Sequence, residues 1–224
     1  MTNQHYGQFC GLARAAEIVG QRWTLLILRD LTVAPQRYSD LVAGLPGIPT
    51  NTLASRLKDL EEEGLVERVA PSGAERSVVY RLTPRGAELG PALDALSRWG
   101  AGGMRTPRDG EIVTTASIAS ALQVAAGDGV VPKDWNLSFT VRVGEVETQV
   151  AMRGGAITVA PGPAEKPDLV ITAGPQIRDV LAGELDAQTA VETGVVQLEG
   201  DASLFQRFAD TMRVPYSLNV PATV

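Results

Sequence analysis

The sequence predicts an α+β protein built from two domains of different character. Helical patterns with one short β-rich segment dominate the first half, whereas strand-like runs between Gly and Pro turns dominate the second. The charge divides in the same way, because residues 1–108 hold 13 Lys/Arg and 11 Asp/Glu while residues 109–224 hold 7 and 15. A Gly-rich segment over 100–110 separates the two halves. We therefore expect domains over residues 1–105 and 110–224.

Composition narrows the classes of function. A single cysteine excludes an internal disulfide and fits a reducing compartment, and no apolar run reaches the ~18 residues of a membrane span. The N-terminus lacks the basic and apolar segments of a secretory signal. With His5 as the one histidine, a zinc site or a His-dependent triad is not expected. We expect a cytoplasmic protein that is not an enzyme and holds no metal or cofactor.

The first domain begins with three predicted helices. Apolar spacing predicts the first two over residues 12–20 and 22–31, and the second is apolar on most faces and therefore central to the core. A short third helix is expected over 37–45, because Pro46-Gly47 follows it and breaks the pattern.

A fourth helix is predicted from Pro49 or Thr50 to Gly64. Proline is tolerated in a first turn, and threonine can cap the free amides there. Leu53, Leu57 and Leu60 recur at helical spacing and mark a buried stripe. Polar side chains occupy the other faces; they include Thr50, Asn51, Thr52, Ser55, Arg56 and Lys58.

Two β-like runs follow, over residues 65–70 and 77–83, with a turn-rich tip between them that holds Arg76. An amphipathic helix is then expected over residues 84–100. Helices, a short turn, another helix and a basic-tipped hairpin are the parts of a winged helix-turn-helix. In that fold the second helix of the motif enters the major groove of duplex DNA and the hairpin, or wing, contacts the backbone. Winged helices also serve as protein-interaction modules, which is the alternative function.

The expected contacts differ in what they supply. The amide of Asn51 suits paired hydrogen bonds with adenine, whereas hydroxyl groups discriminate less between bases. Arg56 lies on the flank of the apolar stripe, where it suits a phosphate or a groove edge. Cations spread over the same predicted face are candidate phosphate contacts, which set affinity and register; they are Arg37, Lys58, Arg68 and Arg76.

The segment from Cys10 to about residue 101 resembles the HxlR family of bacterial transcription regulators, relatives of the MarR group. The resemblance rests on "AAEIVGQRWTLLILRDL", "QRYSDLVAGLPGIP", "LASRLKDLEEEGLVERV" and "VVYRLTPRGAEL" in unbroken order. It implies a homodimeric winged-helix protein, commonly a repressor, whose outer helices form the dimer and which binds a two-fold symmetric operator. It also implies recognition roles for Thr50 to Ser55 and Arg56, and wing roles from Arg68 to Arg76. Pro49 departs from the serine that usually starts the recognition helix.

Cys10 matches a position at which some relatives carry a cysteine that senses oxidants or electrophiles. A sensor thiol needs exposure and a lowered pKa. Two alternatives stay open, a buried or inert thiol and a redox sensor.

The second domain shows a helix over 115–127, then strands and short helices. Strands are predicted over 137–143, 146–152, 156–160, 168–173 and 195–200, and helices over 175–185, 187–194 and 203–212. Strands with helices on one face predict an α+β domain.

Residues 114–215, and above all "PDLVITAGPQIRDVLAGELDAQTAVETGVVQLEGD", resemble the sterol carrier protein family. The resemblance implies an apolar tunnel that holds a fatty-acyl or other lipid-like molecule. Large apolar side chains are candidates to line it, although each equally suits a plain core; they are Trp135, Phe139, Met152, Phe205, Phe208 and Met212. Three functions follow: a repressor that responds to an apolar ligand, a redox switch at Cys10, or a lipid carrier whose winged domain only mediates assembly.

Overall fold

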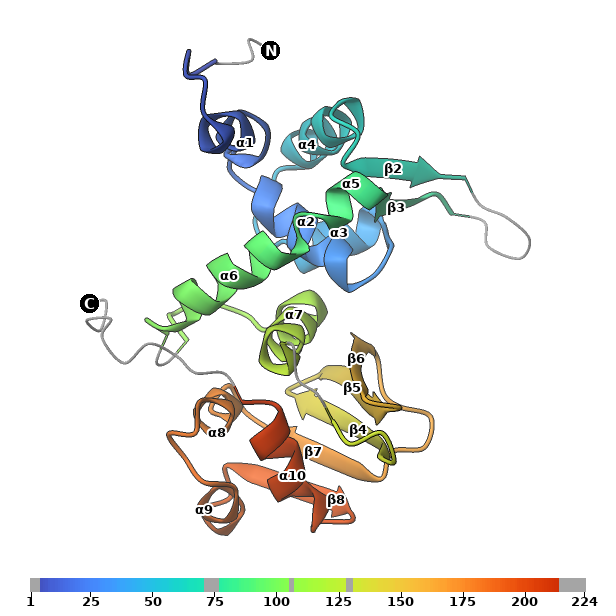
Figure 1. Ribbon diagram of the computed structural model, residues 1–224, viewed down its shortest axis with the longest axis vertical. Coiled ribbons are helices and arrows are strands. Elements are labelled where there is room, and N and C mark those ends of the chain that lie inside the picture. Colours follow the sequence, from blue (N-terminus) through green and yellow to red (C-terminus); the bar gives the residue numbers. More distant parts are fainter. Residues whose placement is uncertain (1–4, 71–76, 105–106, 128–130, 214–224) are drawn as a thin grey trace. The chain divides into compact units, whose positions relative to one another are not determined.

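The computed structural model describes residues 5–70, 77–104, 107–127 and 131–213 (Figure 1). Contacts within the chain divide it into two compact units between Leu93 and Asp94. This division falls inside helix α6 (Gly90–Ala101), upstream of the Gly-rich segment. The limits of 105 and 110 for the two domains stay a prediction. None of the helices in the described ranges is long and apolar enough to cross a membrane.

The first unit contains the expected helices together with a small sheet. Its helices are α1 (Gly11–Val19), α2 (Thr24–Val33), α3 (Tyr38–Gly44), α4 (Thr50–Glu62) and α5 (Pro84–Ala87). Its strands are β1 (Gln36–Arg37), β2 (Val66–Val69) and β3 (Val79–Leu82). The strands pair antiparallel in the order β1-β3-β2, with Val66 opposite Leu82 and Val69 opposite Val79. Helices and a hairpin in this order confirm the winged helix-turn-helix fold.

The core of the first unit is built from the apolar stripes of α2, α3 and α4. Leu53, Leu57 and Leu60 are buried as the spacing predicts, and they pack with residues such as Ile27 and Leu41. The end of α4 also follows the prediction, because Gly64 has a φ of +67° and Leu65 donates its N–H to the carbonyl of Leu60. Glycine adopts that left-handed conformation without steric cost.

The single helix expected over residues 84–100 is wrong, because the structure has two. Thr83 caps α5 by accepting a hydrogen bond from the N–H of Gly86, and α5 ends at Ala87. Pro91 has no backbone N–H, so it cannot bond the carbonyl one turn earlier and continue the same helix. The chain therefore begins again as α6 at Gly90.

Within its described residues the second unit has a five-stranded sheet and four further helices. Its strands are β4 (Asn136–Val143), β5 (Val146–Arg153), β6 (Ala156–Pro161), β7 (Leu169–Ala173) and β8 (Val196–Gly200). Its helices are α7 (Thr115–Ala126), α8 (Ile177–Ala182), α9 (Ala187–Glu192) and α10 (Leu204–Thr211). The sheet order is β6-β5-β4-β7-β8, in which the β4–β7 pair is parallel and the other pairs are antiparallel.

One face of this sheet is apolar and the other is polar. Phe139 lies opposite Val150 and Leu169, and residues directly opposite each other share a face. This face and helices α7, α8, α9 and α10 form one hydrophobic cluster. On the other face Arg142 pairs with Glu147 at 2.9 Å. The predicted α+β domain with its helices on one face is thus confirmed.

Candidate nucleic-acid interface

Helix α4 begins at Thr50, with Pro49 as the residue before its first turn. Pro49 has an extended backbone, with a φ of −66° and a ψ of 137°, and no side chain caps the helix. The expected capping role of threonine is therefore wrong, since Thr50 already lies within the helix. The first helical hydrogen bond joins the N–H of Leu53 to the carbonyl of Pro49 at 3.0 Å. The N–H groups of the first turn therefore have no acceptor on the preceding residue, and that of Thr52 instead bonds the Asn51 side chain.

A side chain that the sequence did not single out holds the start of α4. The hydroxyl of Tyr38, the first residue of α3, donates a 2.7 Å hydrogen bond to the carbonyl oxygen of Thr50. The turn between the two helices is closed by Ile48, whose N–H donates to the carbonyl of Leu45. These two bonds set the angle at which α4 leaves α3.

The N-terminal half of α4 presents short polar side chains, which we call the polar face: Thr50, Asn51, Thr52 and Ser55. Thr50 and Asn51 are exposed, whereas Thr52 and Ser55 are half-buried beside the leucine stripe. The Asn51 Oδ1 atom accepts a hydrogen bond from the N–H of Thr52 at 2.8 Å, which fixes the amide at the helix start. No acidic residue lies in the first turn. The structure thus brings together four of the expected base contacts.

Arg56 and Lys58 of α4 each pair with an acid further along the helix. The guanidinium of Arg56 lies 2.7 Å from the carboxylate of Asp59, and only 18% of the Arg56 side chain is exposed. Lys58 pairs with Glu62 at 3.5 Å, with both side chains exposed. Glu61 and Glu62 lie near the C-terminal end, about 15 Å along the axis from Asn51 at 1.5 Å per residue. The acids are therefore separated from the polar face by most of the helix.

Two of the other expected phosphate contacts lie on the small sheet. Arg37 is exposed in β1, opposite Val79 of β3, and Arg68 is exposed in β2, opposite Tyr80. Arg76, at the tip of the predicted wing, lies outside the described residues. The pairing of Arg37 with β3 was not foreseen, because a two-residue strand leaves no periodic pattern.

Helix α2 contains a buried carboxylate, that of Asp30. Asp30 is fully buried, and its Oδ1 atom accepts a 2.7 Å hydrogen bond from Nε of Arg29. Its Oδ2 atom has no hydrogen-bond partner among the described residues. Burial raises the pKa of Asp30 above its ordinary value, and the Arg29 guanidinium opposes part of that rise. The carboxylate therefore weakens the unit when it is ionised.

Cys10 is exposed at the N-terminal cap of α1. Its carbonyl accepts the N–H of Arg14 at 3.0 Å, which is the first bond of the helix. A buried thiol is therefore excluded, while an exposed inert thiol and a redox sensor both stay open.

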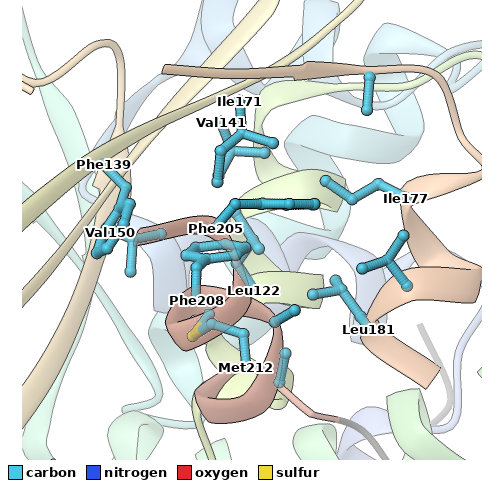
Figure 2. Packing of buried hydrophobic residues seen from close by; sticks show 14 of the residues in the cluster. Leu122, Phe139, Val141, Val150, Ile171, Ile177, Leu181, Phe205, Phe208 and Met212 are labelled. Carbon is cyan, nitrogen blue, oxygen red and sulfur yellow. The ribbon is translucent and has the colours of Figure 1, made fainter. Parts of the chain in front are cut away.

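Four of the predicted tunnel residues, Phe139, Phe205, Phe208 and Met212, pack together in the core of the second unit (Figure 2). Phe139 and Phe208 are buried, with ring centroids 5.1 Å apart and planes tilted by 52°. Phe205 and Met212 of the α10 segment are buried with them, as is Met152 of β5. Trp135 is half-buried and carries the guanidinium of Arg207 at 5.7 Å from its ring centroid.

Two family models match the chain in separate segments. Residues 18–107 match the HxlR-like helix-turn-helix family, and residues 132–213 match the SCP-2 sterol transfer family. The second match agrees with the mixed sheet and helices of the second unit.

Several bacterial proteins are similar to the N-terminal part. An uncharacterized HTH-type transcriptional regulator of Mycobacterium tuberculosis is 46% identical over 89 residues, which are 40% of this chain and 56% of that protein. The chain thus spans little more than half the length of this relative. The regulator YvaP of Bacillus subtilis is 40% identical over 87 residues, which are 38% of this chain and 80% of YvaP. Both relatives are named as HTH-type transcriptional regulators.

Among solved structures, the reduced form of the transcriptional regulator YodB from Bacillus subtilis is 31% identical. It covers 46% of this chain and 100% of YodB, with a TM-score of 0.38. The sequence matches to residues 18–107, together with the helices and hairpin described above, assign the family. The chain belongs to the HxlR-like helix-turn-helix family and carries a C-terminal domain of the SCP-2 type.

Proposed function

We propose that this protein is a homodimeric transcriptional regulator, in the simplest case a repressor, that binds operator DNA through α4. The observation that carries the proposal is the polar face of α4, which is free of acids and lies over a buried leucine stripe. Such a surface fits the major groove, while Arg37, Lys58 and Arg68 supply phosphate contacts. The relatives named as HTH-type transcriptional regulators support the same function.

Exposed apolar side chains support a dimer. Phe9 is fully exposed and Leu12 of α1 is 77% exposed, while Leu96 and Trp99 of α6 are 51% and 79% exposed. Large apolar side chains grouped on a helix surface mark a protein interface. A two-fold dimer presents two recognition helices to successive major grooves of a palindromic site.

A gel shift with the DNA upstream of the protein's own gene, at about 0.15 M salt, tests DNA binding. Asn51→Ala is expected to weaken the specific complex about ten- to a hundredfold, because a paired contact with a base contributes about 1–3 kcal/mol. Glu61→Ala, at the far end of the same helix, is the matched control and should leave affinity within about twofold. An unchanged shift in the Asn51 variant refutes the role of the polar face.

The C-terminal domain would supply the response to an apolar ligand, as its SCP-2 match suggests. Native mass spectrometry of the purified chain tests this point, since a retained acyl compound adds a discrete mass. A retained lipid together with no specific DNA binding would favour the lipid-carrier alternative, in which the winged unit only mediates assembly.

The exposure of Cys10 favours a second candidate function, a redox or electrophile switch. In this case diamide or a quinone releases the wild-type protein from DNA, and Cys10→Ser abolishes the release. A normal response in the serine variant would rule this function out.

A further inference from the structure

A pocket of about 280 Å³ lies beside the start of α4. Its walls come from three segments: the turn before α2, the turn between α3 and α4, and the first two turns of α4. Its lining includes Arg22, Trp23, Pro49, Thr52 and Arg56. Sites for small molecules commonly begin near 300 Å³, so this volume suits a compact ligand and not a long acyl chain.

The lining is cationic and aromatic. It contains two arginines, one indole and no acidic residue. The guanidinium of Arg22 lies over the Trp23 ring, 5.3 Å from its centroid. The cation and the aromatic ring are therefore adjacent in the pocket lining. The Arg56 side chain is 18% exposed, and its guanidinium lies 2.7 Å from the carboxylate of Asp59. Guanidinium groups bind carboxylates with paired hydrogen bonds, and an indole with a proline offers an apolar surface for a flat ring.

Trp23 adopts a backbone conformation that bulky residues rarely have. Its φ is +79° and its ψ is −22°, and within the described ranges it is the one residue other than glycine with a positive φ. Such conformations persist where the surrounding structure enforces them, and they gather at ligand clamps and switch regions. Here the strained residue forms a wall of the pocket.

We propose that this pocket binds a small organic carboxylate with a flat apolar body. The carboxylate lies between Arg22 and Arg56, and the body lies against Trp23 and Pro49. Thr52 and Arg56 line the pocket and also belong to the surface of α4 that we propose enters DNA. Bound ligand and DNA therefore exclude each other, and this second step rests on the proposed function.

A DNA phosphate is the other anion that such a pocket could take, so binding is measured first without DNA. The full chain has three tryptophans, and replacing two of them in W99F/W135F leaves Trp23 as the sole indole. Benzoate is the probe, and inorganic phosphate is the anion without an apolar body. We expect a saturable change in Trp23 emission with benzoate, and no competition from phosphate at equal concentration.

Variants link this signal to the pocket. Arg22→Gln is expected to raise the Kd for benzoate about tenfold, because it removes a charged hydrogen-bond donor. Arg14→Gln, at an exposed arginine of α1 that does not line the pocket, should leave the Kd unchanged. No saturable signal, an equal effect of phosphate, or an unaltered Kd in Arg22→Gln would overturn the carboxylate site.

Competition with DNA tests the second step in the wild-type chain. Benzoate should raise the apparent Kd for the upstream DNA by the factor 1 + [benzoate]/Kd, and Arg22→Gln should need about tenfold more benzoate for the same effect. Benzoate that binds without altering DNA affinity overturns the exclusion. If the protein binds no DNA, the proposed function fails, while the fluorescence titration still decides on the site.

Discussion

The hydroxyl of Tyr38 donates a 2.7 Å hydrogen bond to the carbonyl oxygen of Thr50 and so ties the first residue of α3 to the first residue of α4. Because Pro49 brings no side-chain cap, this bond takes a large part in orienting the start of the helix. The polar face that we propose contacts DNA begins at the same residue. A substitution at Tyr38 should therefore lower the affinity for DNA, although Tyr38 itself is not one of the proposed base contacts.

Tyr38→Phe removes this bond and keeps the ring. We expect a loss of about 1 kcal/mol in the free energy of unfolding of the first unit, the usual net contribution of one hydrogen bond. DNA affinity should fall about three- to tenfold, because the helix start becomes free to tilt. Fluorescence anisotropy with labelled upstream DNA measures the affinity, and circular dichroism in urea measures the stability. A loss of stability with unaltered affinity would show that Tyr38 does not position α4.

Asp30→Asn is expected to alter the dependence of stability on pH. Burial raises the pKa of Asp30 in the folded state, so the folded protein binds its proton more tightly than the unfolded chain does. Stability is therefore lost as the pH rises from the ordinary Asp value toward the raised value, and the loss persists at neutral pH. The asparagine has no charge to desolvate, and it retains an oxygen that can accept the Arg29 hydrogen bond.

Urea unfolding between pH 4 and 8 measures this effect. We expect Asp30→Asn to be more stable than the wild type by about 1 kcal/mol at pH 7 and about equal to it at the acidic end. Glu61→Gln, at an exposed position of α4, controls for the general loss of one negative charge. A variant that is less stable at pH 7 would show that the pair with Arg29 outweighs the burial of the carboxylate.

The elements with a regular apolar pattern were predictable, and those made by tertiary contacts were not. The stripe of Leu53, Leu57 and Leu60 located α4, because helical spacing alone places these residues on one face. The two-residue strand β1 exists only through its pairing with β3. In the sequence, the adjacent Arg29 and Asp30 have the appearance of an ordinary solvent-exposed charged pair, so the burial of Asp30 is not evident. The left-handed Trp23 and the Tyr38 bond depend on neighbours distant in sequence. Local patterns carry no signal for them.

Phe208→Ala tests whether the second unit is a filled core or an open tunnel. Phe208 is fully buried against Phe139, so its truncation should cost about 3–5 kcal/mol in the stability of the second unit. Gln206→Ala, on the exposed side of the same helix, should stay within about 0.5 kcal/mol of the wild type. Urea unfolding followed by circular dichroism measures both variants. A cost under about 1 kcal/mol would indicate a pliable interior, as expected of a site that opens for a ligand.

Trp99→Asp tests the proposed dimer. Trp99 and Leu96 are neighbours on α6 at a spacing of three residues, and both are exposed in the single chain. An aspartate in a buried apolar interface would leave a charge without a partner, which costs several kcal/mol and raises the dissociation constant of the dimer at least a hundredfold.

Sedimentation velocity at micromolar protein measures the outcome. The wild type should sediment as a dimer of the 23.7 kDa chain, and Trp99→Asp should sediment as the monomer with an unaltered circular dichroism spectrum. Arg98→Gln, at the adjacent position of the same helix, is expected to remain dimeric. The monomeric variant should also bind DNA far more weakly, because a palindromic site then contacts two independent chains and loses the advantage of linked recognition helices. If Trp99→Asp stays dimeric, α6 is not part of the dimer interface, and the exposed side chains of α1 become the next surface to test.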